Sequence, residues 1–447
     1  MNDLIFSWAW LAIGLAWLWI AIWQGFLFYK AMDVIGKNPR SSGFFLTITI
    51  LWIALVESAG IYGLIIAFQI LSASFIDPLT AIWVGSAIWL AWLWVGIWEW
   101  ILVWSAIEAM NRDTENRNRI LTYMILFLAL VESAAIYGLI IAFQLLTKLE
   151  LSPYLAIWAW LSIWLTWLWV GIWEWILSWK SISLMSQKPN QKWYLLTSTI
   201  LWIALVETAA IYWLIMSFSI IESDLIIPMS AIWAGLAVWL AWLWVWIGEW
   251  LLVSWSYESM LTNRANKSKV LTYMILFLAL VESAAIYGLI IGLQILSNWS
   301  VEWLASIWAW LAIWLAWLWV GIWEWFMSSK SIKVISKRPS LSMFFLTITI
   351  LAIALVESAS IYWLIISMQI LSTNEILWFA AVWAWLAIWF AWLWAWVGEW
   401  FLTWASFDSI ARNPKVKQRV LTYMILWVAL VESAAIYGLI IAFTILS

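Results

Sequence analysis

One stretch of the sequence, with a glutamate at its centre, recurs six times at a constant spacing of 75 residues. Its second copy reads ALVESAAIYGLIIAF and covers residues 129–143. The glutamate lies within a long apolar run, and an isolated carboxylate at the centre of a bilayer costs roughly 2.5–3.5 kcal/mol. A repeat this regular must be interpreted before anything else, because each copy is one structural unit. The recurring acids are Glu57, Glu132, Glu207, Glu282, Glu357 and Glu432.

Each repeat consists of two apolar arms around a short polar loop, which predicts a helical hairpin. An arm of about 30 residues is long enough to cross the roughly 30 Å hydrocarbon core of a bilayer. The chain is 67% hydrophobic and only 10% charged, which excludes a soluble domain. We therefore expect an all-α membrane protein with twelve transmembrane helices in six tandem hairpins. The predicted hairpins 1 to 6 cover residues 1–75, 76–150, 151–225, 226–300, 301–375 and 376–447.

The charged residues predict which side of the membrane each loop faces. All Lys and Arg except Lys148 lie in or beside the loops inside the hairpins. By the positive-inside rule these loops are cytoplasmic, and both termini and the linkers are outside a prokaryotic cell membrane. Residues 1–29 show neither a basic start nor a cleavage site, so we interpret them as the first span. The linkers carry Asp77, Glu150, Glu222, Asp224, Glu302 and Glu375.

Several kinds of chemistry are excluded by residues that the chain lacks. It contains no Cys and no His, so disulfides, cysteine nucleophiles and histidine-ligated metals are ruled out. It also contains no G-x-x-x-x-G-K-[ST] motif for binding nucleotide phosphates. We expect a protein that is not an enzyme, with no cofactor and no nucleic-acid partner.

A second polar position recurs in the first arms, 33 residues before each recurring acid. In two antiparallel arms this spacing brings both residues to one membrane depth, so each hairpin holds a Gln–Glu or Glu–Glu pair. Such carboxyls must be protonated, ion-bound or hydrogen-bonded to each other. A proton-sharing brace is the alternative to an ion ligand for the first-arm glutamates. The first-arm residues are Gln24, Glu99, Glu174, Glu249, Glu324 and Glu399.

Two further polar residues accompany every second-arm acid. The next residue is always a hydroxyl, which can bind an ion or only bond its own helix. Five residues after the acid is a tyrosine, whose alternative role is simple packing. The hydroxyl residues are Ser58, Ser133, Thr208, Ser283, Ser358 and Ser433. The tyrosines are Tyr62, Tyr137, Tyr212, Tyr287, Tyr362 and Tyr437.

Three features together resemble the c subunit of F-type ATP synthases, the proteolipid of the rotor ring, along essentially the whole chain. The first arm ends in a form of G-x-G-[QE]-G, seen as Trp23-Gln24-Gly25. The loop is similar to A-R-[QN]-P, clearest at residues 411–414, and the second arm carries the acid in ALVES-x-x-IYGL. The sequence departs from the family in fusing six hairpins, and in lacking the loop proline at Thr114 and Arg264.

The resemblance implies a c-ring-like array whose second-arm acids carry Na⁺ or H⁺. In sodium-driven rings of this family, one hairpin supplies the Gln or Glu and the main Glu. The neighbouring hairpin supplies the Ser hydroxyl and the carbonyl two residues before its own acid, and the Tyr locks the carboxylate. Oxygen-only ligands favour sodium, while a proton needs only the acid and an apolar jacket. The carbonyls would be those of Leu55, Leu130, Leu205, Leu280, Leu355 and Leu430.

The resemblance also implies partners. These are other copies of the chain in a ring, central-stalk subunits at the cytoplasmic loops, and membrane lipid. A further partner is subunit a of the stator, which supplies an arginine. Two chains giving twelve hairpins is the expected ring, with three chains or mixed proteolipids as alternatives. A V/A-type proteolipid and a stand-alone or designed bundle without a stator remain the competing interpretations.

The 51 tryptophans need their own explanation, because many lie in the middle of the first arms. The 75-residue alignment places Gly14 beside Trp164, and Gly138 beside Trp213. No packing position accepts the smallest and the largest side chain indifferently. We hypothesise that many of these tryptophans are glycines in the organism, through a UGA codon read as glycine. The alternative is a bundle that is packed with tryptophan.

Overall fold

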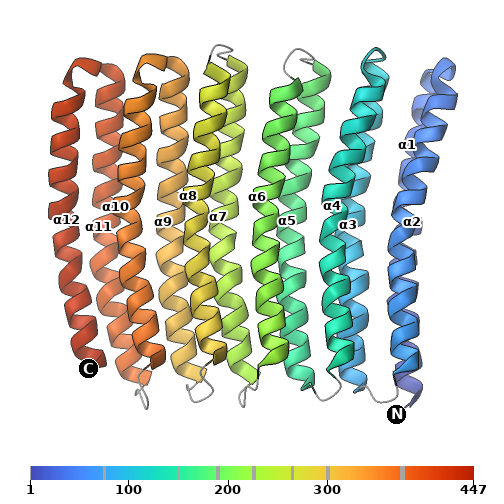
Figure 1. Cartoon of the computed structure of the whole chain (residues 1–447), viewed down its shortest axis with the longest axis horizontal. Coiled ribbons are helices and arrows are strands. Elements are labelled where there is room, and N and C mark those ends of the chain that lie inside the picture. The colour runs from blue at the N-terminus through green and yellow to red at the C-terminus, as the bar shows by residue number, and fades with distance from the viewer. Residues whose placement is uncertain are drawn as a thin grey trace. The chain divides into compact units, whose positions relative to one another are not determined.

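Each repeat folds as two long antiparallel α-helices joined by a short loop (Figure 1). The structure is a computed structural model that describes residues 2–73, 77–148, 151–187, 192–223, 228–262, 266–297, 303–372 and 378–447. In hairpins 1 to 3 the helices are α1 (Asn2–Lys37), α2 (Ser42–Ser72), α3 (Pro78–Arg112), α4 (Arg117–Thr147), α5 (Pro153–Gln187) and α6 (Lys192–Glu222). In hairpins 4 to 6 they are α7 (Pro228–Thr262), α8 (Lys267–Ser297), α9 (Trp303–Lys337), α10 (Ser342–Ser372), α11 (Trp378–Arg412) and α12 (Lys417–Leu446).

Proline marks where several of these helices begin. Pro78, Pro153 and Pro228 are the first residues of α3, α5 and α7, a position where the missing N–H costs nothing. Asp77 caps α3, accepting a hydrogen bond of 2.8 Å from the backbone N–H of Leu79. In the described part of the chain, hairpin loops also contain short 3₁₀ turns that start at a proline: η1 (Pro39–Ser41), η4 (Pro339–Leu341) and η5 (Pro414–Val416).

The chain divides into two compact units of three hairpins each, residues 1–222 and 223–447. In unit 1, the first-arm helices α1, α3 and α5 pack side by side, and the second-arm helices α2, α4 and α6 form a second layer. Unit 2 repeats this arrangement, with α7, α9 and α11 in one layer and α8, α10 and α12 in the other. Because the division falls at three hairpins, the six hairpin domains inferred from the sequence stay a prediction.

The helices have the length and apolarity that a membrane span requires. Within the described residues, nine helices are long and apolar enough to cross a bilayer, and two shorter apolar segments cover Gly60–Ser72 and Ile136–Thr147. The prediction of an all-α membrane protein built from tandem hairpins is confirmed. Large apolar side chains of the second arms remain uncovered, such as Ile61 and Phe68 of α2, as expected for surfaces that face lipid.

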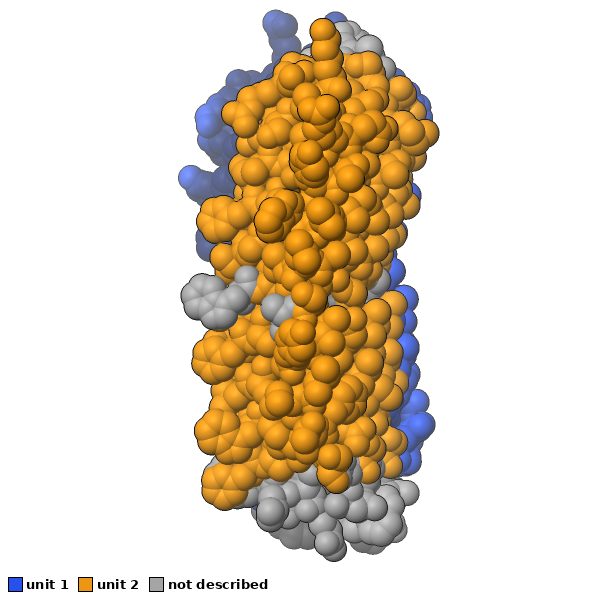
Figure 2. Space-filling view, turned by 90° about the vertical axis from the view of Figure 1, so that its left-hand side faces the viewer, with its two compact units in different colours: residues 1–222 blue, residues 223–447 orange. Residues whose placement is uncertain are grey.

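The end face of unit 2, orange in Figure 2, also carries exposed apolar side chains. The helix α12 leaves Tyr423, Leu426, Trp427 and Leu430 more than half exposed. Its Tyr437, five residues after the acid Glu432, is 70% exposed. Half of a candidate site therefore lies open on this face.

Candidate functional site

The two acidic positions of each hairpin lie in different environments. The first-arm glutamates Glu99, Glu174, Glu249, Glu324 and Glu399 are 0–3% exposed. The second-arm acids are half-buried in hairpins 2 to 6, and Glu57 of hairpin 1 is exposed. One carboxyl of each pair is thus enclosed between helices, while the other borders the lipid-facing layer.

The two arms bring these carboxyls together at the same depth, as the 33-residue spacing predicted. Glu132 acts electrostatically on Glu99, and Glu207 acts in the same way on Glu174. In hairpin 4, Glu249 and Glu282 are close enough to share a side-chain hydrogen bond. Two carboxyl groups can share such a bond only if one of them carries the proton.

A hydroxyl group reaches one of these pairs from the preceding hairpin. The Ser358 hydroxyl of α10 lies 3.3 Å from Oε1 of Glu432 in α12, 74 residues away. The same hydroxyl lies 2.6 Å from the carbonyl oxygen of Leu355, two residues before Glu357. Glu399 of α11 and Glu432 interact electrostatically. Four oxygen-bearing groups therefore converge at this junction: a hydroxyl and a carbonyl from hairpin 5, and two carboxyls from hairpin 6.

The tyrosines cross the same junctions between hairpins, in two ways. Tyr137 of hairpin 2 interacts electrostatically with both Glu207 and Glu174 of hairpin 3. Tyr287 of hairpin 4 has the corresponding relation to Glu357 and Glu324 of hairpin 5. Hairpins 1 and 5 differ, because there the tyrosine ring stacks on a tryptophan of the next hairpin. The stacked pairs are Tyr62–Trp92 at 5.7 Å and Tyr362–Trp392 at 5.6 Å between ring centroids.

The remaining predicted site residues are arranged less completely. Thr208 and Ser433 donate hydrogen bonds to their own helices, at the carbonyls of Leu205 (2.6 Å) and Leu430 (2.7 Å). The side chains of Ser58, Ser133 and Ser283 lie outside the described residues, and so do those of Leu55 and the linker acid Glu150. Tyr212 is half-buried in α6. The ion-binding roles of all these residues stay predictions.

A model of the family described as the ATP synthase C subunit matches the chain four times, at residues 8–70, 82–145, 232–295 and 382–445. These segments cover more than half of the chain and coincide with hairpins 1, 2, 4 and 6. The chain belongs to the ATP synthase C subunit family. Hairpins 3 and 5 lie outside the matched residues and carry the same acid and tyrosine at the same spacing.

Individual relatives in this family are short proteins that match one repeat. The ATP synthase c subunit of Carboxydothermus hydrogenoformans is 49% identical over 45 residues, which is 10% of this chain and 55% of the relative. That of Chloroflexus aurantiacus is 50% identical over 38 residues, 8% of this chain and 50% of the relative. That of Clostridium beijerinckii is 40% identical over 59 residues, 13% of this chain and 83% of the relative. The chain spans about half the length of the first two curated relatives.

The chemistry of this family member's site rests on oxygen atoms. Among the residues that the structure describes, no group of three or more His, Cys, Asp or Glu side chains gathers as a metal site would require. The junction of hairpins 5 and 6 instead offers two carboxyls with a hydroxyl and a carbonyl oxygen beside them. A hard cation or a proton fits such a set better than a transition metal does.

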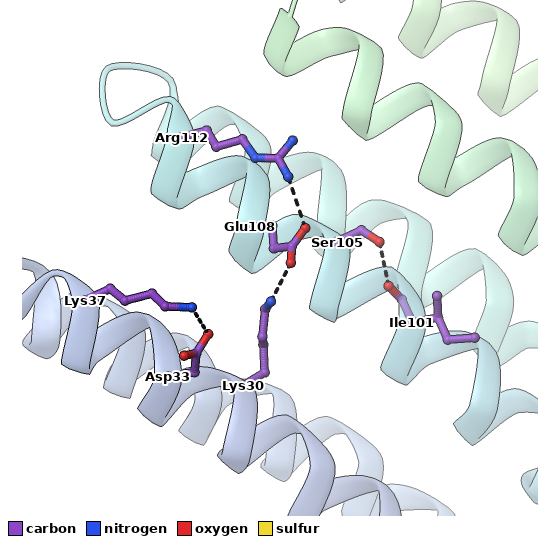
Figure 3. Close-up of polar contacts among 7 residues, drawn as sticks. All are labelled: Lys30, Asp33, Lys37, Ile101, Ser105, Glu108 and Arg112. Atoms are coloured by element: carbon purple, nitrogen blue, oxygen red, sulfur yellow. Dashed lines mark hydrogen bonds and ion pairs between the residues drawn. The ribbon is translucent and has the colours of Figure 1, made fainter.

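Sequence reasoning missed a set of charged contacts at the loop end of the hairpins. Lys30 of α1 pairs with Glu108 of α3, and Glu108 also accepts from Arg112 at 3.3 Å (Figure 3). In unit 2, Lys330 of α9 pairs with Asp408 of α11 at 2.9 Å. The two lysines are 300 residues apart, and so are the two acids. The signal in the sequence is a 150-residue period: the lysine recurs in every odd-numbered hairpin and the acid in every even-numbered hairpin.

Proposed function

We propose that the chain is an ion-translocating rotor-ring component of an ATP synthase, with the second-arm glutamates as its exchangeable cation sites. The observation that carries the proposal is the junction of hairpins 5 and 6. There Ser358 and Leu355 of one hairpin meet Glu432 and Glu399 of the next. A site shared between neighbours is only complete in an array, and this fits a ring in which identical sites pass a stator one after another.

Each residue has a distinct role in this mechanism. The second-arm carboxylate, for example Glu432, takes up and releases the cation, because it borders the lipid-facing layer. The enclosed first-arm carboxyl, Glu399, keeps a proton and donates a hydrogen bond to the second-arm carboxylate. The carbonyl of Leu355 and the hydroxyl of Ser358 complete the oxygen set. A neutralised site can then cross the hydrocarbon at little cost, whereas a bare carboxylate would cost roughly 2.5–3.5 kcal/mol.

The cation is Na⁺ or H⁺, and different features support each. Sodium is supported by the oxygen set at Glu432, where a bound cation would turn the Ser358 hydrogen away from the Leu355 carbonyl so that both oxygens face the ion. A proton is supported by hairpins 3 and 6, where Thr208 and Ser433 bond only their own helices among the contacts that the structure describes. Of the two we favour sodium, because carboxyl pairs with a hydroxyl beside them provide more oxygens than a proton needs.

The partners follow from the same mechanism. Other copies of the chain supply the missing neighbours, since Glu57 and Tyr437 are both exposed. The stator supplies an arginine, because no Lys or Arg lies in the middle of the spans. The basic loops face the cytoplasm and contact the central stalk, and ATP chemistry takes place in other subunits. The loop sequence Ala411-Arg412-Asn413-Pro414 favours an F-type over a V/A-type assembly.

Carbodiimide labelling tests the proposal. Dicyclohexylcarbodiimide reacts with protonated carboxyls in membranes, and peptide mass spectrometry identifies which glutamates it modifies. We expect labelling of Glu132, Glu207 and their equivalents, with protection by sodium at constant pH. Loss of labelling only on raising the pH would assign the site to protons. Labelling that neither sodium nor pH affects would overturn the rotor function.

A further inference from the structure

Hairpins 3 and 5 contain a buried row of hydroxyl groups that begins beside the first-arm carboxyl. In α5, Ser178 and Ser181 follow Glu174 at four and seven residues, so the three side chains share one face of the helix. The equivalent residues in α9 are Glu324, Ser328 and Ser331. All six side chains are 0% exposed. We call each set, with the threonine described next, the hydroxyl row.

The loop-side end of the hydroxyl row joins the two arms of the hairpin. The hydroxyl oxygens of Ser181 and Thr199 lie 2.8 Å apart. Thr199 also lies 2.6 Å from the carbonyl of Leu195, to which it donates, so its oxygen accepts the Ser181 hydrogen. Hairpin 5 repeats this geometry, with 2.8 Å between Ser331 and Thr349 and 2.6 Å from Thr349 to the carbonyl of Phe345.

Among the residues that the structure describes, the middle of the hydroxyl row has no hydrogen-bond partner. The hydroxyls of Ser178 and Ser328 are buried and unpaired, and both carboxyl oxygens of Glu174 and Glu324 lack a hydrogen-bond donor. Buried polar groups in proteins are paired with protein atoms or with ordered water. Along the helix axis, Ser178 lies about 6 Å from Glu174 and Ser181 about 4.5 Å from Ser178, a spacing that one water molecule bridges.

We propose that hairpins 3 and 5 each bind buried water between the first-arm carboxyl and the serine–threonine pair. The water oxygen accepts a hydrogen bond from the protonated carboxyl of Glu174 or Glu324, and the water donates hydrogen bonds to the serine oxygens. Ser178 and Ser328 are positioning residues for this water. The other ionisable groups that face each carboxyl are the second-arm acid (Glu207 or Glu357) and the tyrosine of the preceding hairpin (Tyr137 or Tyr287).

Hairpins 2 and 4 provide the natural contrast. At the position of Ser178 they have Val103 and Val253, and at the position of Thr199 they have Met124 and Met274. All four of these side chains are fully buried. An apolar wall cannot hold a water, so the first-arm carboxyl of hairpin 2, which also has Ala106 at the position of Ser181, lacks this partner, whereas hairpin 4 keeps the buried Ser256 at that position. The proposal deepens the proposed function, because it takes Glu174 and Glu324 as the proton-holding members of their pairs.

Infrared spectroscopy of the full chain in lipid vesicles tests the proposal. The C=O bands of Glu174 and Glu324 are assigned as those lost in the Glu174→Gln, Glu324→Gln variant. We expect Ser178→Val with Ser328→Val to move these bands to higher frequency. We also expect it to slow their hydrogen–deuterium exchange about tenfold, because the carboxyl proton loses the bound water with which it exchanges, an interaction of about one ordinary hydrogen bond. The control pair Ser178→Thr and Ser328→Thr is isosteric with the valine variant but keeps the hydroxyls, and it should leave both readouts unchanged.

Unchanged bands and exchange in a folded valine variant would overturn the water site. If the valine variant fails to fold, Val253→Ser with Met274→Thr gives the converse test, since together with Ser256 these changes rebuild the hydroxyl row in hairpin 4 and should add a fast-exchanging carboxyl at Glu249. Absence of such a gain would also overturn it. Carbodiimide labelling separates this result from the proposed function. If sodium and pH do not affect carbodiimide labelling of the unmodified chain, only the rotor function is overturned. The infrared bands and their exchange rates test only the water site.

Discussion

The two acidic positions of each hairpin show how one residue type takes two roles. The first-arm glutamate sits in a layer where small side chains let helices approach closely, and it is enclosed almost completely. The second-arm glutamate sits in the outer layer and is half-buried. Burial without an exchange route favours a carboxyl that keeps its proton. In the proposed function the partly open position exchanges the cation, and the contrast between the layers supports that division of roles.

The largest expected effect follows from removing the second-arm acid. Glu207→Gln leaves hairpin 3 without a negative charge to hold the cation or to face the stator arginine. We expect ATP-driven cation transport in reconstituted vesicles to fall to background, because a single dead site blocks a turning ring. Transport that continued at more than half of the normal rate would contradict the assignment.

The matched change in the first arm should have a much smaller effect. Glu174→Gln reproduces the residue that hairpin 1 carries naturally at Gln24. An amide still donates a hydrogen bond to Glu207, so we expect transport to drop by less than about tenfold, the cost of one weakened hydrogen bond. Equal loss in both variants would show that the two layers do not differ in role.

A further prediction concerns tryptophans that occupy positions where other repeats have glycine. At Gly138, Gly288 and Gly438 the two arms approach so closely that an added Cβ would lie within 3.0 Å of atoms of the facing arm. The same position in hairpins 3 and 5 carries Trp213 and Trp363, both fully buried. Trp213 leaves its indole N–H without a partner, although buried tryptophans normally find one. We expect peptide mass spectrometry of the native protein to find glycine at 213 and 363.

Other glycines pack against tryptophans, so finding tryptophan instead of glycine by mass spectrometry would also be informative. An added Cβ at Gly171 would collide with the indole of Trp98 of the preceding hairpin, and one at Gly96 would lie 2.9 Å from Trp23. Glycine here provides room for an indole. Peptides with tryptophan masses at 98 and 213 would therefore end the recoding hypothesis and establish a bundle packed by tryptophan against glycine.

The next effect in size concerns the cation affinity of one junction. Ser358→Ala removes the hydroxyl near Glu432 while leaving the Leu355 carbonyl in place. Loss of one oxygen ligand of ordinary hydrogen-bond strength should weaken sodium protection of Glu432 about fivefold in carbodiimide labelling. Ser433→Ala is the control, because Ser433 bonds its own helix at Leu430. The same weakening in both variants would refute a ligand role for Ser358.

The sequence predicted the contacts within a hairpin better than those between hairpins. A fixed spacing of 33 residues around one loop determines the pairing of Glu99 with Glu132, since antiparallel helices have a fixed rise per residue. No such rule sets the approach of Tyr137 to Glu174, or the stacking of Tyr62 on Trp92, although both tyrosines stand in the same motif. These differences depend on which side chains the neighbouring hairpin presents, and therefore on packing rather than on spacing.

The smallest expected effects lie at the loop ends, where two ion pairs differ in burial. Lys30 is 7% exposed and joins α1 to α3 through Glu108, so Glu108→Gln leaves a nearly buried ammonium without its partner. Removing one member of a partly buried pair should lower the free energy of unfolding by about 1–2 kcal/mol. The control is Asp33→Asn, whose 2.7 Å pair with Lys37 is largely solvent-exposed and should contribute less to stability. Unfolding in sodium dodecyl sulfate, followed by circular dichroism, measures both, and equal losses would show that burial does not distinguish the two pairs.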